Sequence, residues 1–201
     1  MIGRRTLFIA ALASLASAAA AAAPASPPAR DDMSLGNPKA KVTVVEYASV
    51  GCPHCAVWGT TVFPEFKKAY IDTGKARFVY REMLTGNTTL AAAGFLTARC
   101  AGPTKYFQVV DGVYRAQAEI AQTGDGYAPL VKIAKDAGLT EDQFNACLKD
   151  PAQVAALEAR DKRAEADGVT GTPTFKVNGK TVEGEVSLEA LGAAIAHAPR
   201  K

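Results

Sequence analysis

The chain has 201 residues, of which 48% are hydrophobic and 21% charged, as in an ordinary globular protein with enough length for a sizeable core. The formal net charge is only +3. This charge gives no electrostatic basis for binding nucleic acid or an anionic membrane surface. A single domain, with room for an insertion, is expected.

The first segment of the chain has the pattern of a secretory signal peptide, which we predict over residues 1–23. Arg4 and Arg5 supply a positive start, residues 7–16 an apolar core, and the following small residues a cleavage site. A membrane anchor is the alternative, but this alanine-rich segment is short and weakly apolar for holding in a bilayer. We therefore predict an exported, periplasmic protein.

The next segment, residues 24–34, is rich in Pro, Ala and Ser, and we predict it to be a disordered leader. Removal of Arg4 and Arg5 with the signal leaves the mature chain near +1. Export also places the four cysteines of the chain where disulfide bonds persist.

The central feature is a C-x-x-C motif between a strand and a helix. Residues 41–48 form a dense β-branched run that predicts a buried strand, and Pro53 suits the first turn of a helix. Cys52 is therefore expected at the helix N-terminus and Cys55 one turn inside. Free N–H groups and the positive end of the helix dipole favour a thiolate at Cys52, and a protonated His54 adds to this effect.

Two chemistries fit a C-x-x-C motif. Cys55 is close enough to attack a mixed disulfide formed at Cys52, which is how a dithiol catalyst releases its partner. Half of a zinc site is the alternative, but no second C-x-x-C and no H-x-x-x-H follows. The strand before the motif and the helix after it favour redox chemistry, and we predict no metal and no cofactor.

The remaining elements complete the order strand, helix, strand, helices, strand, strand, helix. The helix after the motif is expected to kink near residues 60–63, because Pro64 lies inside it. Alanine-rich sequence with four breaks predicts four or five helices over residues 88–167. The other predicted elements are a strand over 76–82, a hairpin of strands 174–177 and 180–183 joined by Asn178 and Gly179, and a helix over 187–195.

These residues resemble a known family. Glu46-Tyr47-Ala48-Ser49-Val50-Gly51-Cys52-Pro53-His54-Cys55, the helical insertion and Gly171-Thr172-Pro173-Thr174-Phe175 together are similar to the DsbA-like family of bacterial periplasmic thiol:disulfide oxidoreductases. The resemblance implies an α/β protein, a thioredoxin fold with an inserted all-helical domain. We place the thioredoxin domain at residues 35–86 and 169–201 and the insertion at 87–168.

The resemblance also implies roles for individual residues. Cys52 would be the exposed nucleophile, Cys55 its buried partner, and Thr172-Pro173 a cis peptide that faces the disulfide and pairs with substrate. An ordinary trans turn is the alternative for Pro173. The implied role is to introduce disulfides into reduced exported polypeptides, with reoxidation by a membrane quinone-linked partner. Thr172 departs from the valine of the family's namesake, and several isomerase and reductase relatives carry threonine here.

Glu46 lies on the predicted buried strand, where an ionisable group is costly unless it has a use. Its counterpart in the family is a buried acid, and the natural role is proton exchange with Cys55. A carboxylate at the strand edge, in contact with water, is the alternative.

Cys100 and Cys147 have no partner at redox-motif spacing, and an exported chain with one C-x-x-C leaves these two to pair. We predict a structural disulfide, with two separate buried thiols as the alternative. The functional prediction is a monomeric disulfide oxidase. A reductase or isomerase of the same fold comes second, and a peptide-holding chaperone or metal-binding module third.

Overall fold

The structure is a computed structural model that describes residues 29–182 and 186–199. A five-stranded mixed sheet has the strand order β1-β3-β2-β4-β5, with β2 and β3 parallel and the other neighbours antiparallel. The strands are β1 (Met33–Leu35), β2 (Thr43–Ala48), β3 (Arg77–Glu82), β4 (Thr174–Val177) and β5 (Lys180–Thr181). This sheet is the α/β core that the sequence predicted.

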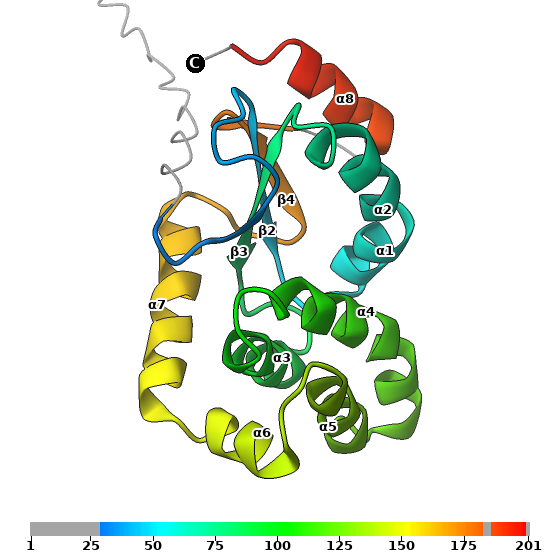
Figure 1. The fold of residues 1–201 in the computed structure, drawn as a ribbon, viewed down its shortest axis with the longest axis vertical. Helices are drawn as coiled ribbons and strands as arrows, with labels where there is room; N and C mark the ends of the chain where they lie inside the picture. Colours follow the sequence, from blue (N-terminus) through cyan, green and yellow to red (C-terminus); the bar gives the residue numbers. More distant parts are fainter. Residues whose placement is uncertain (1–28, 183–185, 200–201) are drawn as a thin grey trace, which may run out of the picture.

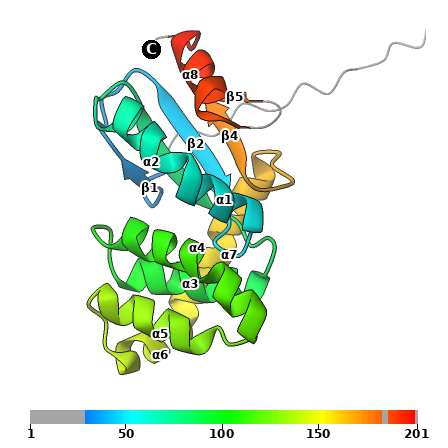
Figure 2. The same ribbon diagram turned by 90° about the vertical axis from the view of Figure 1, so that its right-hand side faces the viewer.

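Helices cover both faces of the sheet and form a second layer beyond one end of it. α1 and α2 lie on one side of the sheet and α7 on the other, while α3 to α6 form the lower half of the molecule (Figures 1 and 2). Five helices thus separate β3 from β4, as predicted. The helices are α1 (Pro53–Thr61), α2 (Phe63–Phe66), the π-helical turn η1 (Lys67–Ile71), α3 (Thr88–Cys100), α4 (Tyr106–Thr123), α5 (Tyr127–Asp136), α6 (Glu141–Leu148), α7 (Pro151–Ala166) and α8 (Leu188–Ala196).

The prediction of a disordered leader over residues 24–34 is wrong for its second half. The residues of β1 pair with β3 in antiparallel register. Just before β1, the Asp32 carboxylate lies 3.1 Å from the buried Arg81 guanidinium, which needs a negative partner in the interior. A strand of three residues is too short to show alternation in the sequence. Residues 24–28 and the predicted signal peptide lie outside the described residues.

The helix after the active-site motif is interrupted where the proline pattern predicted a kink. α1 ends at Thr61, and α2 starts at Phe63 with Pro64 in its first turn. Because Pro64 has no N–H to donate and crowds the preceding turn, the chain continues as a new helix around Val62 instead of as one straight helix.

A buried carboxylate fixes the helical layer to the sheet. Glu82, at the end of β3, accepts from Arg99 of α3 at 2.6 Å, from Arg160 of α7 at 2.5 Å and from the Tyr106 hydroxyl of α4 at 2.8 Å. A buried carboxylate needs such partners, and here they come from three helices of the insertion. α4 also packs directly against α1, and the site described below lies beside this contact.

Apolar side chains pack on both faces of the sheet. Phe78 and Phe175 belong to the large cluster under α1, whereas Val45 and Val79 belong to a small cluster on the opposite face. Within residues 29–182 and 186–199, no helix combines the length and the hydrophobicity that a bilayer crossing requires.

Candidate active site

The two cysteines of the C-x-x-C motif lie at the start of α1, just beyond the end of β2. Cys52 is the N-cap residue of α1 and Pro53 is the first residue of the helix, as the sequence predicted. Both thiols are free in the structure. Cys52 is only 6% exposed, which differs from the exposed nucleophile that the resemblance implied. The reason is the loop that contains Thr172, because the Cys52 sulfur lies 3.3 Å from the Thr172 carbonyl oxygen.

The surroundings of Cys52 favour its thiolate. A hydrogen bond from the Cys55 thiol is the largest of the favourable contacts, and the Thr172 side chain and the backbone N–H groups of Cys55 and His54 add to it. Together they outweigh burial and lower the pKa of Cys52 from 9.0 to about 5. His54 thus contributes through its backbone at the helix N-terminus, where free N–H groups stabilise an anion. A contribution from the exposed His54 imidazole stays a prediction.

Cys55 has the opposite environment. Its side chain is fully buried, and burial, the hydrogen bond to Cys52 and the nearby Glu46 carboxylate all raise the pKa of its thiol. At neutral pH Cys52 is therefore ionised while Cys55 holds its proton. This division matches a nucleophile that forms mixed disulfides and a protected thiol that resolves them.

The loop before β4 closes over the pair. The Thr172-Pro173 peptide is cis, so a trans turn is excluded. The Thr172 hydroxyl lies 2.5 Å from the hydroxyl of Thr85, a residue in the loop after β3. Sequence reasoning missed Thr85, because a single threonine in a loop carries no signal and its neighbour is 87 residues away in the chain.

Glu46 lies on β2, the central strand of the sheet, which ends just before the motif. It is opposite Tyr80 on β3 and opposite Phe175 on β4, and it is only 2% exposed. Burial and the nearby Cys52 raise the pKa of this carboxyl well above its ordinary value. The alternative of a strand-edge carboxylate in water is therefore excluded.

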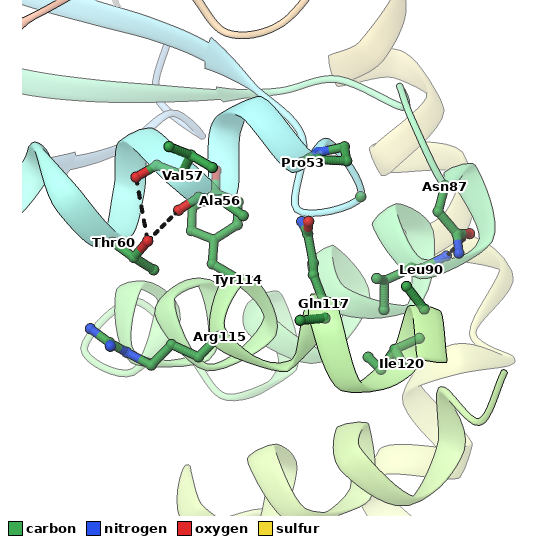
Figure 3. Close-up of a pocket in the computed structure, with 13 residues that line it drawn as sticks. Pro53, Ala56, Val57, Thr60, Asn87, Leu90, Tyr114, Arg115, Gln117 and Ile120 are labelled. Atoms are coloured by element: carbon green, nitrogen blue, oxygen red, sulfur yellow. Dashed lines mark hydrogen bonds between the residues drawn. The ribbon is translucent and has the colours of Figure 1, made fainter. Parts of the chain in front are cut away.

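A groove of about 680 Å³ runs beside the motif, between α1, the start of α3 and α4 (Figure 3). Gln117 of α4 points from its floor to the loop before α1, where its amide donates to the Val50 carbonyl at 2.7 Å and to the Cys52 carbonyl at 3.2 Å. Gln117 holds the backbone of the reactive loop. Gln117 could not be found from the sequence, since the helical pattern identifies α4 and not what its polar residues contact.

The second pair of cysteines lies in the helical layer. Cys100 at the end of α3 and Cys147 in α6 form a disulfide, with their Cα atoms 6.4 Å apart. They are therefore not two separate thiols. Within the described part of the chain, no three His, Cys, Asp or Glu side chains are grouped as metal ligands.

A thioredoxin-type sheet with a C-x-x-C at a helix N-terminus, facing a cis-proline loop, defines the thioredoxin class of proteins. The sequence model of the Thioredoxin family matches residues 29–197, and the chain belongs to this family. A Rickettsia conorii protein, provisionally named a protein-disulfide oxidoreductase, is 37% identical over 167 residues, which cover 82% of this chain and 59% of that protein. The chain thus spans about three fifths of the length of this relative and of the similar protein from Rickettsia prowazekii.

Solved structures agree with this assignment. The crystal structure of alpha-DsbA1 from Wolbachia pipientis matches with a TM-score of 0.74 and 26% identity, over 84% of this chain and 91% of that one. BdbD from Bacillus subtilis matches with a TM-score of 0.78 over 87% of this chain and 96% of that one, but at 21% identity it shows the fold alone. The predicted DsbA-like resemblance and the thioredoxin fold with a helical insertion are confirmed.

Proposed function

We propose that this protein is a thiol:disulfide oxidoreductase that introduces disulfides into exported proteins. The observation that carries this proposal is the placement of the two motif cysteines, with Cys52 at the N-cap of α1 and Cys55 fully buried inside the helix. This placement lowers the pKa of Cys52 to about 5 and raises that of Cys55. Relatives named for protein-disulfide oxidoreductase activity and a DsbA neighbour support it.

The exchange proceeds in two steps. A substrate thiolate attacks the Cys52 sulfur of the Cys52–Cys55 disulfide, a substrate–Cys52 disulfide forms, and Cys55 leaves as a thiolate that takes up one proton. A second substrate thiolate then attacks its own sulfur in the mixed disulfide, and Cys52 leaves as a stable thiolate. The substrate loses two electrons and becomes a disulfide, while the enzyme gains them as one thiolate and one thiol.

The direction follows from which form of the enzyme is stabilised. A dithiol whose reduced form is stabilised is a strong oxidant, and the low pKa of Cys52 stabilises the reduced form. Thr172 contributes to this low pKa through its side chain. A threonine at this position is therefore compatible with an oxidase in this chain, although the sequence left that point open.

The surface around the motif suits an unfolded polypeptide. Val57 of α1 is 61% exposed, and it borders both the groove on the α4 side and a second groove lined by His54 and Pro173. Grooves lined largely by apolar side chains are where ligands commonly bind. An extended segment of substrate would pair with the backbone of Thr172, beside the Cys52 sulfur.

The setting of the reaction is part of the same proposal. The protein acts as a monomer in the periplasm on reduced exported polypeptides, and a membrane quinone-linked partner reoxidises it. The predicted signal peptide and the named family support this setting.

A trapping experiment tests the proposed function. Oxidised protein is mixed with a reduced, unfolded substrate protein, and the products are separated under non-reducing conditions. The wild-type protein should transfer its disulfide, Cys55→Ala should form a stable mixed disulfide through Cys52, and Cys52→Ala should do neither. The Cys100→Ala, Cys147→Ala double variant is the matched control and should transfer normally. A Cys52→Ala variant that retained full effect on substrate folding would instead indicate a chaperone.

A further inference from the structure

We propose that a cavity beneath the active site, between β2, α1 and α4, holds the water through which Glu46 exchanges its proton with solvent, and that the hydroxyl groups of Tyr80 and Tyr114 orient this water. The inference rests on the proposed function, because it assigns the proton that Cys55 takes up and releases in each exchange.

The first observation is an unpartnered buried carboxylate oxygen. Glu46 Oε1 has no hydrogen-bond partner among the residues that the structure describes, and the side chain is 2% exposed. Leaving such an acceptor unsatisfied in the interior costs on the order of 1–3 kcal/mol, so a partner is expected. Glu46 lines a cavity, and a water molecule there can supply the missing hydrogen bond.

The second observation is the size and reach of this cavity. Its volume is about 120 Å³. A water molecule occupies on the order of 30 Å³ in the liquid, so several can fit. The same cavity is lined by the buried Glu46 and by Asp111 of α4, whose side chain is 49% exposed. One continuous space therefore joins the buried acid to a residue at the protein surface.

The third observation is a pair of tyrosine hydroxyls in the wall of the cavity. Tyr80 lies opposite Glu46 in the parallel register of β2 and β3, and its hydroxyl is 2.8 Å from that of Tyr114 on α4. The Tyr114 ring can lie against α1 because the residue of α1 at this contact is Gly59. A Cβ at Gly59 would lie only 2.7 Å from the Tyr114 ring. A larger residue at position 59 would displace the Tyr114 hydroxyl.

The polar groups near Glu46 decide its protonation. Cys52 and Cys55 lie at the N-terminal end of α1, and the tyrosine pair and Asp111 line the cavity; among the described residues that line it there is no Lys or Arg. Burial and the nearby Cys52 favour the neutral form of the Glu46 carboxyl. Burial also raises the pKa of both tyrosines, so they stay protonated and act as hydrogen-bonding groups, not as bases.

The proton then moves as follows. When Cys55 leaves the disulfide as a thiolate, the Glu46 carboxyl gives its proton to the Cys55 sulfur and becomes a carboxylate. A cavity water, held by the tyrosine hydroxyls, gives one proton to the carboxylate and takes one proton from bulk solvent, so that it remains a water molecule. Reoxidation runs the same steps backwards, so no net proton remains on Glu46. Tyr80 and Tyr114 are positioning residues in this scheme.

Removal of the Tyr114 hydroxyl tests the scheme. The reduction of oxidised protein by dithiothreitol is followed by stopped-flow fluorescence of Trp58, the single tryptophan, in H₂O and in D₂O. Tyr114→Phe should slow the reaction by roughly tenfold and increase its solvent isotope effect, because general acid–base proton transfer is impaired. The pKa of Cys52, read from thiolate absorbance, should not change.

Tyr106→Phe is the matched control, because it removes a buried hydroxyl that bonds Glu82 and does not line the cavity. In the Glu46→Gln background, the Tyr114→Phe substitution should have no further effect. A Tyr114→Phe variant that behaves like Tyr106→Phe, or that slows the Glu46→Gln protein as well, would overturn the proton route. If wild-type protein does not exchange at Cys52 at all, the proposed function fails first, and the two failures are distinguishable.

Discussion

Acidification from pH 7 to pH 5 is expected to destabilise the reduced protein by protonating the Cys52 thiolate. The pKa of this thiol is about 5 in the folded protein, against an ordinary value of 9.0. A group whose pKa is lower in the folded than in the unfolded protein stabilises the fold, and this contribution is complete at pH values above the unfolded pKa. The contribution disappears as the pH falls through the folded pKa. Between these two values, stability should therefore rise with pH.

The size of the effect follows from linkage. Between the two pKa values, the free energy of unfolding changes by about 1.4 kcal/mol for each pH unit. The change becomes smaller as the pH approaches the lower pKa value. The Cys52 thiolate should contribute about 2.7 kcal/mol at pH 7 and about 0.4 kcal/mol at pH 5, a loss of about 2 kcal/mol. Glu46 has the opposite effect on the pH dependence of stability. Its pKa is raised in the folded protein, so the stability that it contributes is lost as the pH rises.

The assay is urea unfolding of reduced protein at several pH values. Measurements in the Glu46→Gln background remove the opposing carboxyl, and Cys52→Ala in that background is the matched control. The free energy of unfolding should fall by about 2 kcal/mol more in the protein with Cys52 than in the control between pH 7 and pH 5. Parallel pH profiles for the two proteins would refute the claim that the site stabilises a thiolate.

Two further predictions concern neighbouring parts of the structure. Thr85→Val should raise the pKa of Cys52 from about 5 to roughly 6, because Thr172 loses the hydroxyl partner that orients its side chain, and thiolate absorbance measures this change; an unchanged titration would exclude a role for Thr85. Replacing both Cys100 and Cys147 by Ala should lower the free energy of unfolding by up to roughly 4 kcal/mol, since the disulfide closes a loop of 47 residues, and should leave the Cys52 titration as it is. Equal urea midpoints with and without this disulfide would contradict the second prediction.

Much of the fold could be predicted from local sequence. The β-branched run before the motif identifies β2, and Pro53 identifies the start of α1. Asn178 and Gly179 both have positive φ in the turn between β4 and β5, as a two-residue hairpin requires. These features depend on a few adjacent residues, and the sequence displays them directly.

The parts that could not be predicted depend on contacts between distant segments. β1 is too short for a pattern, and its contacts are distant in the chain: it pairs with β3, and Asp32 beside it pairs with Arg81. Thr85 reaches Thr172 only after the fold brings two loops together. The burial of Cys52 has the same origin, because the loop that covers it is 120 residues away in the chain.

The tyrosine pair shows the same limit at the site itself. Glu46 could be identified as a candidate acid from its place on a buried strand, and the structure shows it buried between β3 and β4. The cavity beside it could not be foreseen, since Tyr80 and Tyr114 come from different layers and meet only because α4 crosses α1 at Gly59.

The most direct test of the central claim is the reduction potential of the Cys52–Cys55 pair, measured by equilibration against glutathione buffers. At pH 7 a thiol with a pKa of about 5 is about 100-fold more stable as a thiolate, which makes the pair about 60 mV more oxidising than one with an ordinary thiol. We predict a potential above about −200 mV, on the oxidising side of the glutaredoxins, which becomes less oxidising when Cys52 loses its hydrogen-bond donors. A value near the roughly −270 mV of thioredoxin would contradict the account and indicate a reductase.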